Sequence, residues 1–186
     1  MGCHGGFTLD DATRRSWYNP DDILQDLSAG MVFADVGCGS GFFSILAAKK
    51  VGKTGKGYAI DVDSSSIEKL KKKAKVEGLK NITAKVGAAE ETVFCKACVD
   101  FVFFSMVLHD FADPTKVLQN AKQMIKPIGK LIDLDWKKQE MPFGPPVKIR
   151  FSQEYASTLI QNAGFQIEST KDAGKYHYVI TANPLP

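Results

Sequence analysis

The chain alternates short apolar segments with amphipathic ones, and this order restricts the folds that it can form. Short apolar runs that are separated by helical patterns are typical of parallel strands joined by crossover helices. Such units build an open sheet with helices on both faces, because the crossover connection is right-handed and packs its helix against the sheet. The predicted strands are residues 31–36, 57–60, 82–86, 99–104 and 130–134, and the predicted helices are residues 42–50, 65–77 and 152–163, with a further helix that Asp113 caps and Pro114 begins.

The last part of the chain follows a different pattern. Residues 165–170 and 176–181 flank Asp172-Ala173-Gly174-Lys175, and this short segment leaves no room for a helix. Two such runs around a turn that contains glycine predict a β-hairpin. We therefore expect an α/β fold, a Rossmann-like three-layer sandwich whose mostly parallel sheet ends in a C-terminal antiparallel hairpin.

The length of 186 residues and the balance of 44% hydrophobic and 24% charged residues fit one globular domain. The first dozen residues are rich in glycine and poor in apolar anchors. Asn19 is a suitable helix cap, with Pro20 at the first helical position of a short helix that runs through Leu27. We predict a flexible N-terminal arm over residues 1–18 and a single domain over residues 19–186.

Several classes of function find no support in the composition. The sequence contains no long apolar stretch and no secretory signal pattern, so we expect a cytoplasmic protein without membrane insertion. The net charge is only +3, and the lysine run at residues 71–75 suits the solvated face of a helix, so a nucleic-acid partner is not expected. Cys95 and Cys98 lack a second cysteine pair, so we expect reduced thiols and no metal site.

A cluster of glycines lies between the first strand and the following helix. Gly37, Gly39 and Gly41 allow the backbone to turn sharply and to approach a ligand that faces the helix amides. The dinucleotide pattern G-x-G-x-x-G would place its third glycine at position 42, which is Phe42. The run also lacks the Gly-Lys-Ser or Gly-Lys-Thr of a phosphate-binding P-loop. The spacing therefore disfavours both a dinucleotide and a nucleoside triphosphate.

Two acidic residues refine the ligand. Asp35 enters the glycine loop, where a carboxylate suits a cationic amino group and opposes a pyrophosphate. Asp61 ends the second strand, at the position from which such folds bind the two hydroxyls of a ribose. Asp61 could instead cap the next helix, but Asp63 or Ser64 can do so equally well. We favour the ribose role for Asp61, which predicts a ligand that contains a ribose without phosphates.

These residues resemble class I methyltransferases, and within them the type 11 and the ubiquinone and menaquinone C-methyltransferases. The resemblance implies a seven-stranded sheet with a reversed last strand, S-adenosylmethionine as methyl donor and S-adenosylhomocysteine as product. The motifs that carry it are Asp35-Val36-Gly37-Cys38-Gly39-Ser40-Gly41, Ala59-Ile60-Asp61-Val62-Asp63, Val99-Asp100-Phe101-Val102, Val107-Leu108-His109-Asp110 and Asn162-Ala163-Gly164-Phe165. The residues expected to bind the cofactor are Asp35, Gly37, Cys38, Gly39, Gly41, Asp61, Val62, Ala88, Ala89 and Ser105.

One position departs from the family pattern. Members of the family usually have Gly-Asp-Ala after the third strand, where the aspartate holds the adenine amino group, whereas this chain has Gly87, Ala88 and Ala89. The missing charge-assisted hydrogen bond is worth about 1.5 to 3 kcal/mol. Either Glu90 compensates, or the affinity is lower, or the chain is a regulatory module that binds the cofactor without turnover.

The acceptor is less defined than the donor. His109 is the best acid or base candidate, with Asp110 to orient it, while Asp135 and His177 are explained by a solvated strand end and a cross-strand pair. The segment after the fourth strand lacks the Asp/Asn-Pro-Pro-Tyr/Phe of amino-methylating enzymes. We therefore expect a small molecule with a carbon, oxygen or sulfur acceptor, and keep RNA or protein methylation as an alternative. A monomer and a homodimer both stay open.

Overall fold

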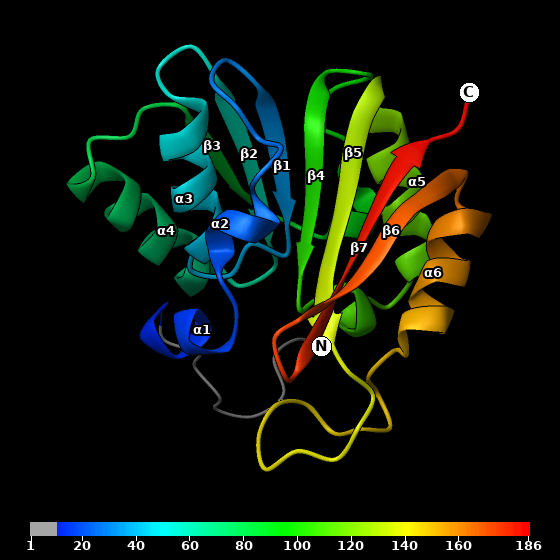
Figure 1. The fold of residues 1–186 in the computed structure, drawn as a ribbon. Helices are drawn as coiled ribbons and strands as arrows, with labels where there is room; N and C mark the ends of the chain where they lie inside the picture. The colour runs from blue at the N-terminus through cyan, green and yellow to red at the C-terminus, as the bar shows by residue number, and fades with distance from the viewer. Residues whose placement is uncertain (1–10) are drawn as a thin grey trace.

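The computed structural model describes residues 11–186 and contains a seven-stranded sheet in the order β3-β2-β1-β4-β5-β7-β6. The pairs from β3 to β5 are parallel, whereas β7 pairs antiparallel with both β5 and β6 (Figure 1). This arrangement confirms the predicted fold class with its terminal hairpin. The strands are β1 (Val32–Val36), β2 (Lys56–Asp61), β3 (Ile82–Val86), β4 (Val99–Ser105), β5 (Ile125–Trp136), β6 (Phe165–Ala173) and β7 (His177–Pro184).

Helices cover both faces of the sheet and bury its central strands. Residues of α5 and α6 pack on one face, and residues of α3 and α4 pack on the other. Strand β4 is therefore buried on both sides, with Val102 and Phe104 in one core cluster and Phe101 and Phe103 in the other. The helical elements are α1 (Asp11–Trp17), α2 (Pro20–Ile23), α3 (Phe42–Val51), α4 (Ser64–Val76), α5 (Pro114–Met124) and α6 (Gln153–Asn162), with the short 3-10 helices η1 (Ala89–Glu91) and η2 (Leu108–Asp110).

The largest difference from the sequence-based prediction concerns β5. The apolar pattern predicts a strand over residues 130–134, but β5 begins directly after α5, at Ile125, and continues to Trp136. Pro127 and Gly129 weaken a strand pattern in isolation. The pairing with β4 nevertheless holds this segment, and its register shifts between Val99 and Phe101. Tertiary pairing thus extends a strand that local preference alone would end.

The first described residues form α1, which lies at the edge of the sheet where the parallel strands end (Figure 1). Trp17 stacks on Phe143 of the β5–α6 loop with ring centroids 5.0 Å apart, and it also contacts the ring of Trp136. Residues 1–10 of the predicted arm lie outside the described residues, so the division at residue 18 stays a prediction. Among residues 11–186, no helix combines the length and the apolarity needed to cross a membrane.

Candidate functional site

The glycine loop crosses the carboxyl end of β1, as the sequence predicts. Its first two amides, those of Gly37 and Cys38, donate hydrogen bonds to Ile60 O of β2 at 2.8 and 3.0 Å. The three glycines all have positive φ angles, of 74°, 50° and 86° along the chain. Residues with side chains adopt such angles only at a cost, so the loop needs glycine at these points. The last of them, Gly41, is the residue that precedes α3.

The three glycines differ in what surrounds their Cα atoms. A side chain at Gly37 would meet Val107, and one at Gly41 would meet Leu70, each with an atom within 2.5 Å. At Gly39, nothing lies within 4 Å of the position that a Cβ would take. Gly37 and Gly41 therefore allow close packing inside the protein, whereas Gly39 leaves open space beside the loop, which is what a loop that receives a ligand requires.

Asp61 is joined to the tip of this loop. Its Oδ2 accepts a hydrogen bond from Gly39 N at 2.7 Å, and its Oδ1 accepts one from Asp63 N at 2.9 Å. The cap of α4 is Asp63, whose carboxylate accepts from the amides of Ser65 and Ser66. The prediction that Asp63 or Ser64 caps the helix is thus confirmed for Asp63. Asp61 does not cap α4, and its hydrogen bond to Gly39 N links the loop to the end of β2.

Asp35 is a buried carboxylate at the entrance of the loop, with 2% of its surface exposed. Its Oδ2 accepts a hydrogen bond from Ser44 Oγ of α3, while its Oδ1 has no partner in the described part of the chain. Burial raises the pKa of Asp35 to about 6, although the Ser44 hydroxyl and the charge of Arg14 act in the opposite direction. A desolvated carboxylate with an unused oxygen is suited to bind a cation.

The predicted adenine end offers backbone and apolar groups. Val62, next to Asp61, is 59% exposed, so its side chain is open to solvent beside the predicted ribose position. Ala88 and Ala89 follow β3, and Ala89 is buried. Glu90 does not stand in for the missing aspartate here, because its Oε1 accepts hydrogen bonds from the amides of Ala112 and Asp113. The interpretation of Glu90 as a substitute receives no support from this geometry.

Two further predicted cofactor residues border the loop. Cys38 is buried inside it, and burial raises the pKa of its thiol well above the usual range. Ser105 ends β4, and its hydroxyl is shielded from solvent without a hydrogen-bond partner in residues 11–186. Because Val36 of β1 pairs with Phe104 of β4, Ser105 lies at the same sheet edge as the loop.

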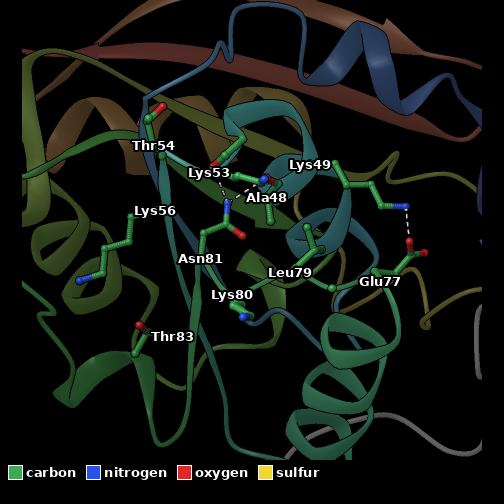
Figure 2. Close-up of a pocket in the computed structure, with 13 residues that line it drawn as sticks. Ala48, Lys49, Lys53, Thr54, Lys56, Glu77, Leu79, Lys80, Asn81 and Thr83 are labelled. Carbon is green, nitrogen blue, oxygen red and sulfur yellow. Dashed lines mark hydrogen bonds and ion pairs between the residues drawn. The ribbon is translucent and has the colours of Figure 1, made fainter.

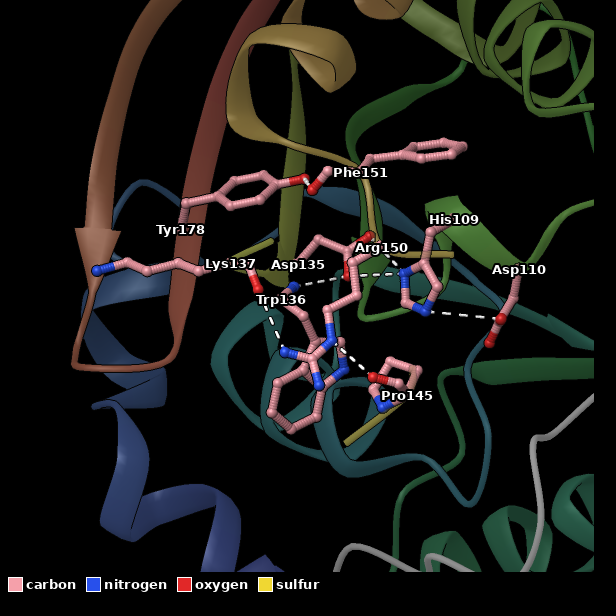
Figure 3. A network of polar contacts seen from close by, with 9 residues as sticks. All are labelled: His109, Asp110, Asp135, Trp136, Lys137, Pro145, Arg150, Phe151 and Tyr178. Carbon is pink, nitrogen blue, oxygen red and sulfur yellow. Dashed lines mark hydrogen bonds and ion pairs between the residues drawn. The ribbon is translucent and has the colours of Figure 1, made fainter. Parts of the chain in front are cut away.

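His109 forms a buried pair with Asp135, which sequence reasoning ranked lower than Asp110. The Nδ1 atom of His109 lies 2.8 Å from Asp135 Oδ1, whereas its Nε2 lies 3.5 Å from Asp110 Oδ1 (Figure 3). Burial favours the neutral imidazole, but the two carboxylates outweigh it and raise the pKa of His109. The sheet explains the pairing: β4 and β5 are neighbours, so residues that follow one strand meet residues at the end of the other.

Two predictions about neighbouring residues are wrong. Asp135 is not a solvated strand end, because only 1% of it is exposed. His177 does not form a simple pair with a tyrosine beside it. It is fully buried opposite Trp136, among the rings of Trp17, Tyr18 and Trp136, and neither ring nitrogen has a partner in the described residues. Burial and nearby cations lower the pKa of His177 to about 3, so it is neutral.

Arg150 organises the loop between β5 and α6, and sequence reasoning did not single it out. It is 2% exposed, and its guanidinium donates hydrogen bonds to backbone carbonyls of the loop that precedes it (Figure 3). A lone arginine after a Pro-Pro turn gives no local signal of this role. The acceptors are the carbonyl oxygens of Lys137, Gln139, Phe143 and Pro145, at distances between 2.7 and 3.3 Å.

Other features of the chain lie outside this constellation. A hollow of about 1110 Å³ is lined by residues 52–56 and 77–81 (Figure 2). These residues lie at the start of β2 and before β3, and therefore at the opposite edge of the sheet. Cys95 and Cys98 form a disulfide, so the prediction of reduced thiols is wrong for them. Their Cα atoms are 5.9 Å apart, a separation that a disulfide spans. Among the described residues, no group of three or more His, Cys, Asp or Glu could hold a metal.

Comparisons with known proteins agree with this geometry. Residues 27–182 match the methyltransferase domain family. A ubiquinone/menaquinone biosynthesis C-methyltransferase from Rickettsia felis is 28% identical over 155 residues, which are 81% of this chain and 60% of that protein. A demethylmenaquinone methyltransferase from Bacillus mycoides is 28% identical over 141 residues, 76% of this chain and 56% of the relative. The chain thus spans somewhat more than half the length of these curated relatives.

A solved structure supports the same assignment over the whole fold. A SAM-dependent methyltransferase from Aquifex aeolicus is 29% identical, with a TM-score of 0.88 over 96% of this chain and 100% of that one. The sheet with its reversed last strand, together with a glycine loop joined to Asp61, defines a class I methyltransferase fold. This chain belongs to the methyltransferase domain family.

Proposed function

We propose that this chain is an S-adenosylmethionine-dependent methyltransferase that acts on a small molecule. The observation that carries the proposal is the arrangement of Gly39 between open space and Asp61, with the unused oxygen of Asp35 at the start of the same loop. The open position at Gly39 leaves room for a ligand, and Asp61 can accept hydrogen bonds from the ribose hydroxyls. The buried carboxylate of Asp35 suits an ammonium, so the three together fit an adenosyl ligand that carries one.

The residues present fit this cofactor. Asp61 would hold the ribose, Asp35 would hold the ammonium, and the open side of the loop at Gly39 would border the methionyl part. Val62, with Ala88 and Ala89, would border the adenine through apolar and backbone contacts, and Ser105 would close the site from β4. When bound, S-adenosylmethionine supplies an electrophilic methyl group, so the protein contributes mainly alignment of the acceptor.

We further propose that His109 is the base for an acceptor that must lose a proton. Asp135 orients the ring through its contact with Nδ1 and leaves Nε2 as the proton acceptor. Asp110 lies on the Nε2 side of the ring. The side chain of His109 is only 1% exposed, so the acceptor reaches it only after the segments over it have moved. The relatives named as quinone-biosynthesis C-methyltransferases favour a carbon acceptor on an activated ring.

Binding and turnover test these proposals separately. Calorimetry with S-adenosylhomocysteine should give saturable binding, and a nicotinamide dinucleotide should give none. Binding of the dinucleotide in place of the adenosyl ligand would contradict the proposal. Transfer of a labelled methyl group to hydroquinones and phenols should then identify an acceptor and would exclude a regulatory module without turnover. The cytoplasmic location and the absence of a nucleic-acid partner remain predictions, and a monomer and a homodimer both stay open.

A further inference from the structure

The side chain of Arg14 reaches from α1 toward the entrance of the glycine loop. Its guanidinium carbon lies 5.1 Å from the centroid of Phe42, the first residue of α3. Its guanidinium lies near the Tyr18 hydroxyl, whose pKa it lowers against the larger effect of burial, but its Nε atom is shielded from solvent without an acceptor in the described part of the chain. A shielded guanidinium donor without an acceptor is costly, so its presence indicates a place for an anion.

Asp35 provides the opposite charge in the same region. The charge of Arg14 is close enough to lower the pKa of Asp35, against the larger effect of burial. Each of the two side chains nevertheless keeps one polar atom without a partner, instead of closing onto the other. The site therefore contains a cation and an anion that are near each other and are both incompletely satisfied.

An α-amino acid group carries an ammonium and a carboxylate, which are the counterions that Asp35 and Arg14 need. Its ammonium would satisfy the buried carboxylate of Asp35, and its carboxylate would accept a hydrogen bond from the shielded Nε of Arg14. We propose that Arg14 binds the α-carboxylate of the methionyl part of S-adenosylmethionine, opposite the ammonium that Asp35 binds. This inference rests on the proposed function, because it assigns one more contact to the same cofactor.

The contact also gives α1 a role in the site. Arg14 belongs to α1, and Trp17 at the end of α1 stacks on Phe143 of the loop that Arg150 organises. A bound carboxylate would thus anchor α1 over the donor and stabilise its contact with the β5–α6 loop. Both segments lie at the sheet edge where β1 and β4 end (Figure 1).

Arg15 offers a matched control on the same helix. Its guanidinium carbon also lies over Phe42, at 5.7 Å from the ring centroid, but its side chain is exposed. If the only role of Arg14 were to pack its charge on this ring, the two arginines would be equivalent. We expect the carboxylate to bind Arg14 and not Arg15, because the Nε of Arg14 is shielded from solvent without an acceptor in the described residues, whereas Arg15 is exposed.

The experiment compares two ligands that differ only in the carboxylate. S-adenosylmethionine and its decarboxylated form share the adenosyl group, the sulfonium and the amine. Wild-type protein should bind the former more tightly by roughly ten-fold or more, as a charge-assisted hydrogen bond implies. Arg14→Gln should bring the ratio of the two dissociation constants close to one, Arg14→Lys should give an intermediate ratio, and Arg15→Gln should keep the wild-type ratio.

The ratio separates the possible failures. If Arg14→Gln is partly unfolded, both affinities fall equally and the ratio still reports the contact. A wild-type ratio in Arg14→Gln overturns this inference, while the cofactor assignment stands because both ligands still bind. If Arg14→Gln does not fold, Arg14→Met, which also removes the charge, is measured in its place, and a wild-type ratio in that variant overturns the inference. Wild-type protein that binds neither ligand contradicts the proposed function as a whole.

Discussion

The imidazole of His109 and the carboxylate of Asp135 lie 2.8 Å apart and are almost fully buried, although 26 positions separate them in the chain. The carboxylate stabilises the protonated ring and raises the pKa of His109 against the effect of burial. A histidine with a raised pKa stabilises the fold below its unfolded value of about 6.5, and this contribution is lost as the pH rises through the folded value.

Asp135→Asn should therefore lower the pKa of His109, because burial then acts with less opposition. If His109 is the base, the acidic limb of the pH–rate profile will move to lower pH in this variant. Asp110→Asn should move it less, since Asp110 lies farther from the ring. The measurement is kcat/KM from pH 5 to 9 with an acceptor identified as above. An acidic limb at the wild-type position in Asp135→Asn argues against His109 as the base.

Asp61→Ala should weaken the binding of S-adenosylhomocysteine by roughly ten-fold or more, because the ribose loses its acceptor and Gly39 N loses its hydrogen bond. Asp63→Ala is the control two residues away. It removes the cap of α4 and should lower the free energy of unfolding by about 1 kcal/mol, with little change in affinity. Calorimetry and urea unfolding of both variants distinguish the two roles, and equal affinities in the two variants would show that Asp61 has no role in binding.

Gly39→Ala should impair binding more than folding. The φ angle of 50° makes alanine unfavourable by roughly 1 kcal/mol, and the added methyl group enters the open space beside the loop. Gly78→Ala is a suitable comparison, since Gly78 has a φ of 66° and equally open surroundings after α4, away from the site. We expect similar losses of stability in thermal unfolding but a loss of cofactor affinity only at Gly39. Full affinity in Gly39→Ala would mean that this space is not used.

Asp35→Asn should stabilise the free protein while it weakens cofactor binding. Because burial raises the pKa of Asp35 to about 6, the folded state carries an unfavourable carboxylate above that pH. Replacement should add on the order of 1 to 3 kcal/mol to the free energy of unfolding at pH 7.5. The gain should shrink as the pH falls through 6 and vanish below the unfolded pKa of about 3.8.

Urea unfolding at pH 7.5 and pH 3.5 measures this effect, and calorimetry at pH 7.5 measures the loss of affinity. Ser44→Ala serves as the counterpart, because it leaves the carboxylate in place without its hydroxyl donor. It should raise the pKa of Asp35 further and destabilise the protein at pH 7.5. Lower stability in Asp35→Asn than in wild type at pH 7.5 would contradict this account.

The sequence by itself determined the parts of the protein that depend on neighbouring residues. The alternation of strands and helices, the glycine loop, the cap at Asp63 and the terminal hairpin all follow from local periodicity and backbone preference, and the structure contains each of them. The position of Asp61 beside the loop was also predictable, because parallel strands bring their carboxyl ends to one edge.

Only the tertiary structure decided which distant side chains meet and which stay apart. It paired His109 with Asp135, turned Glu90 toward Ala112, buried His177 among aromatic rings and brought Arg14 near Asp35. These outcomes depend on the order of strands in the sheet and on the packing of α1 and the β5–α6 loop. Local sequence does not predict such contacts, because the free energy that selects them comes from the burial of apolar surface by residues that are distant in the chain.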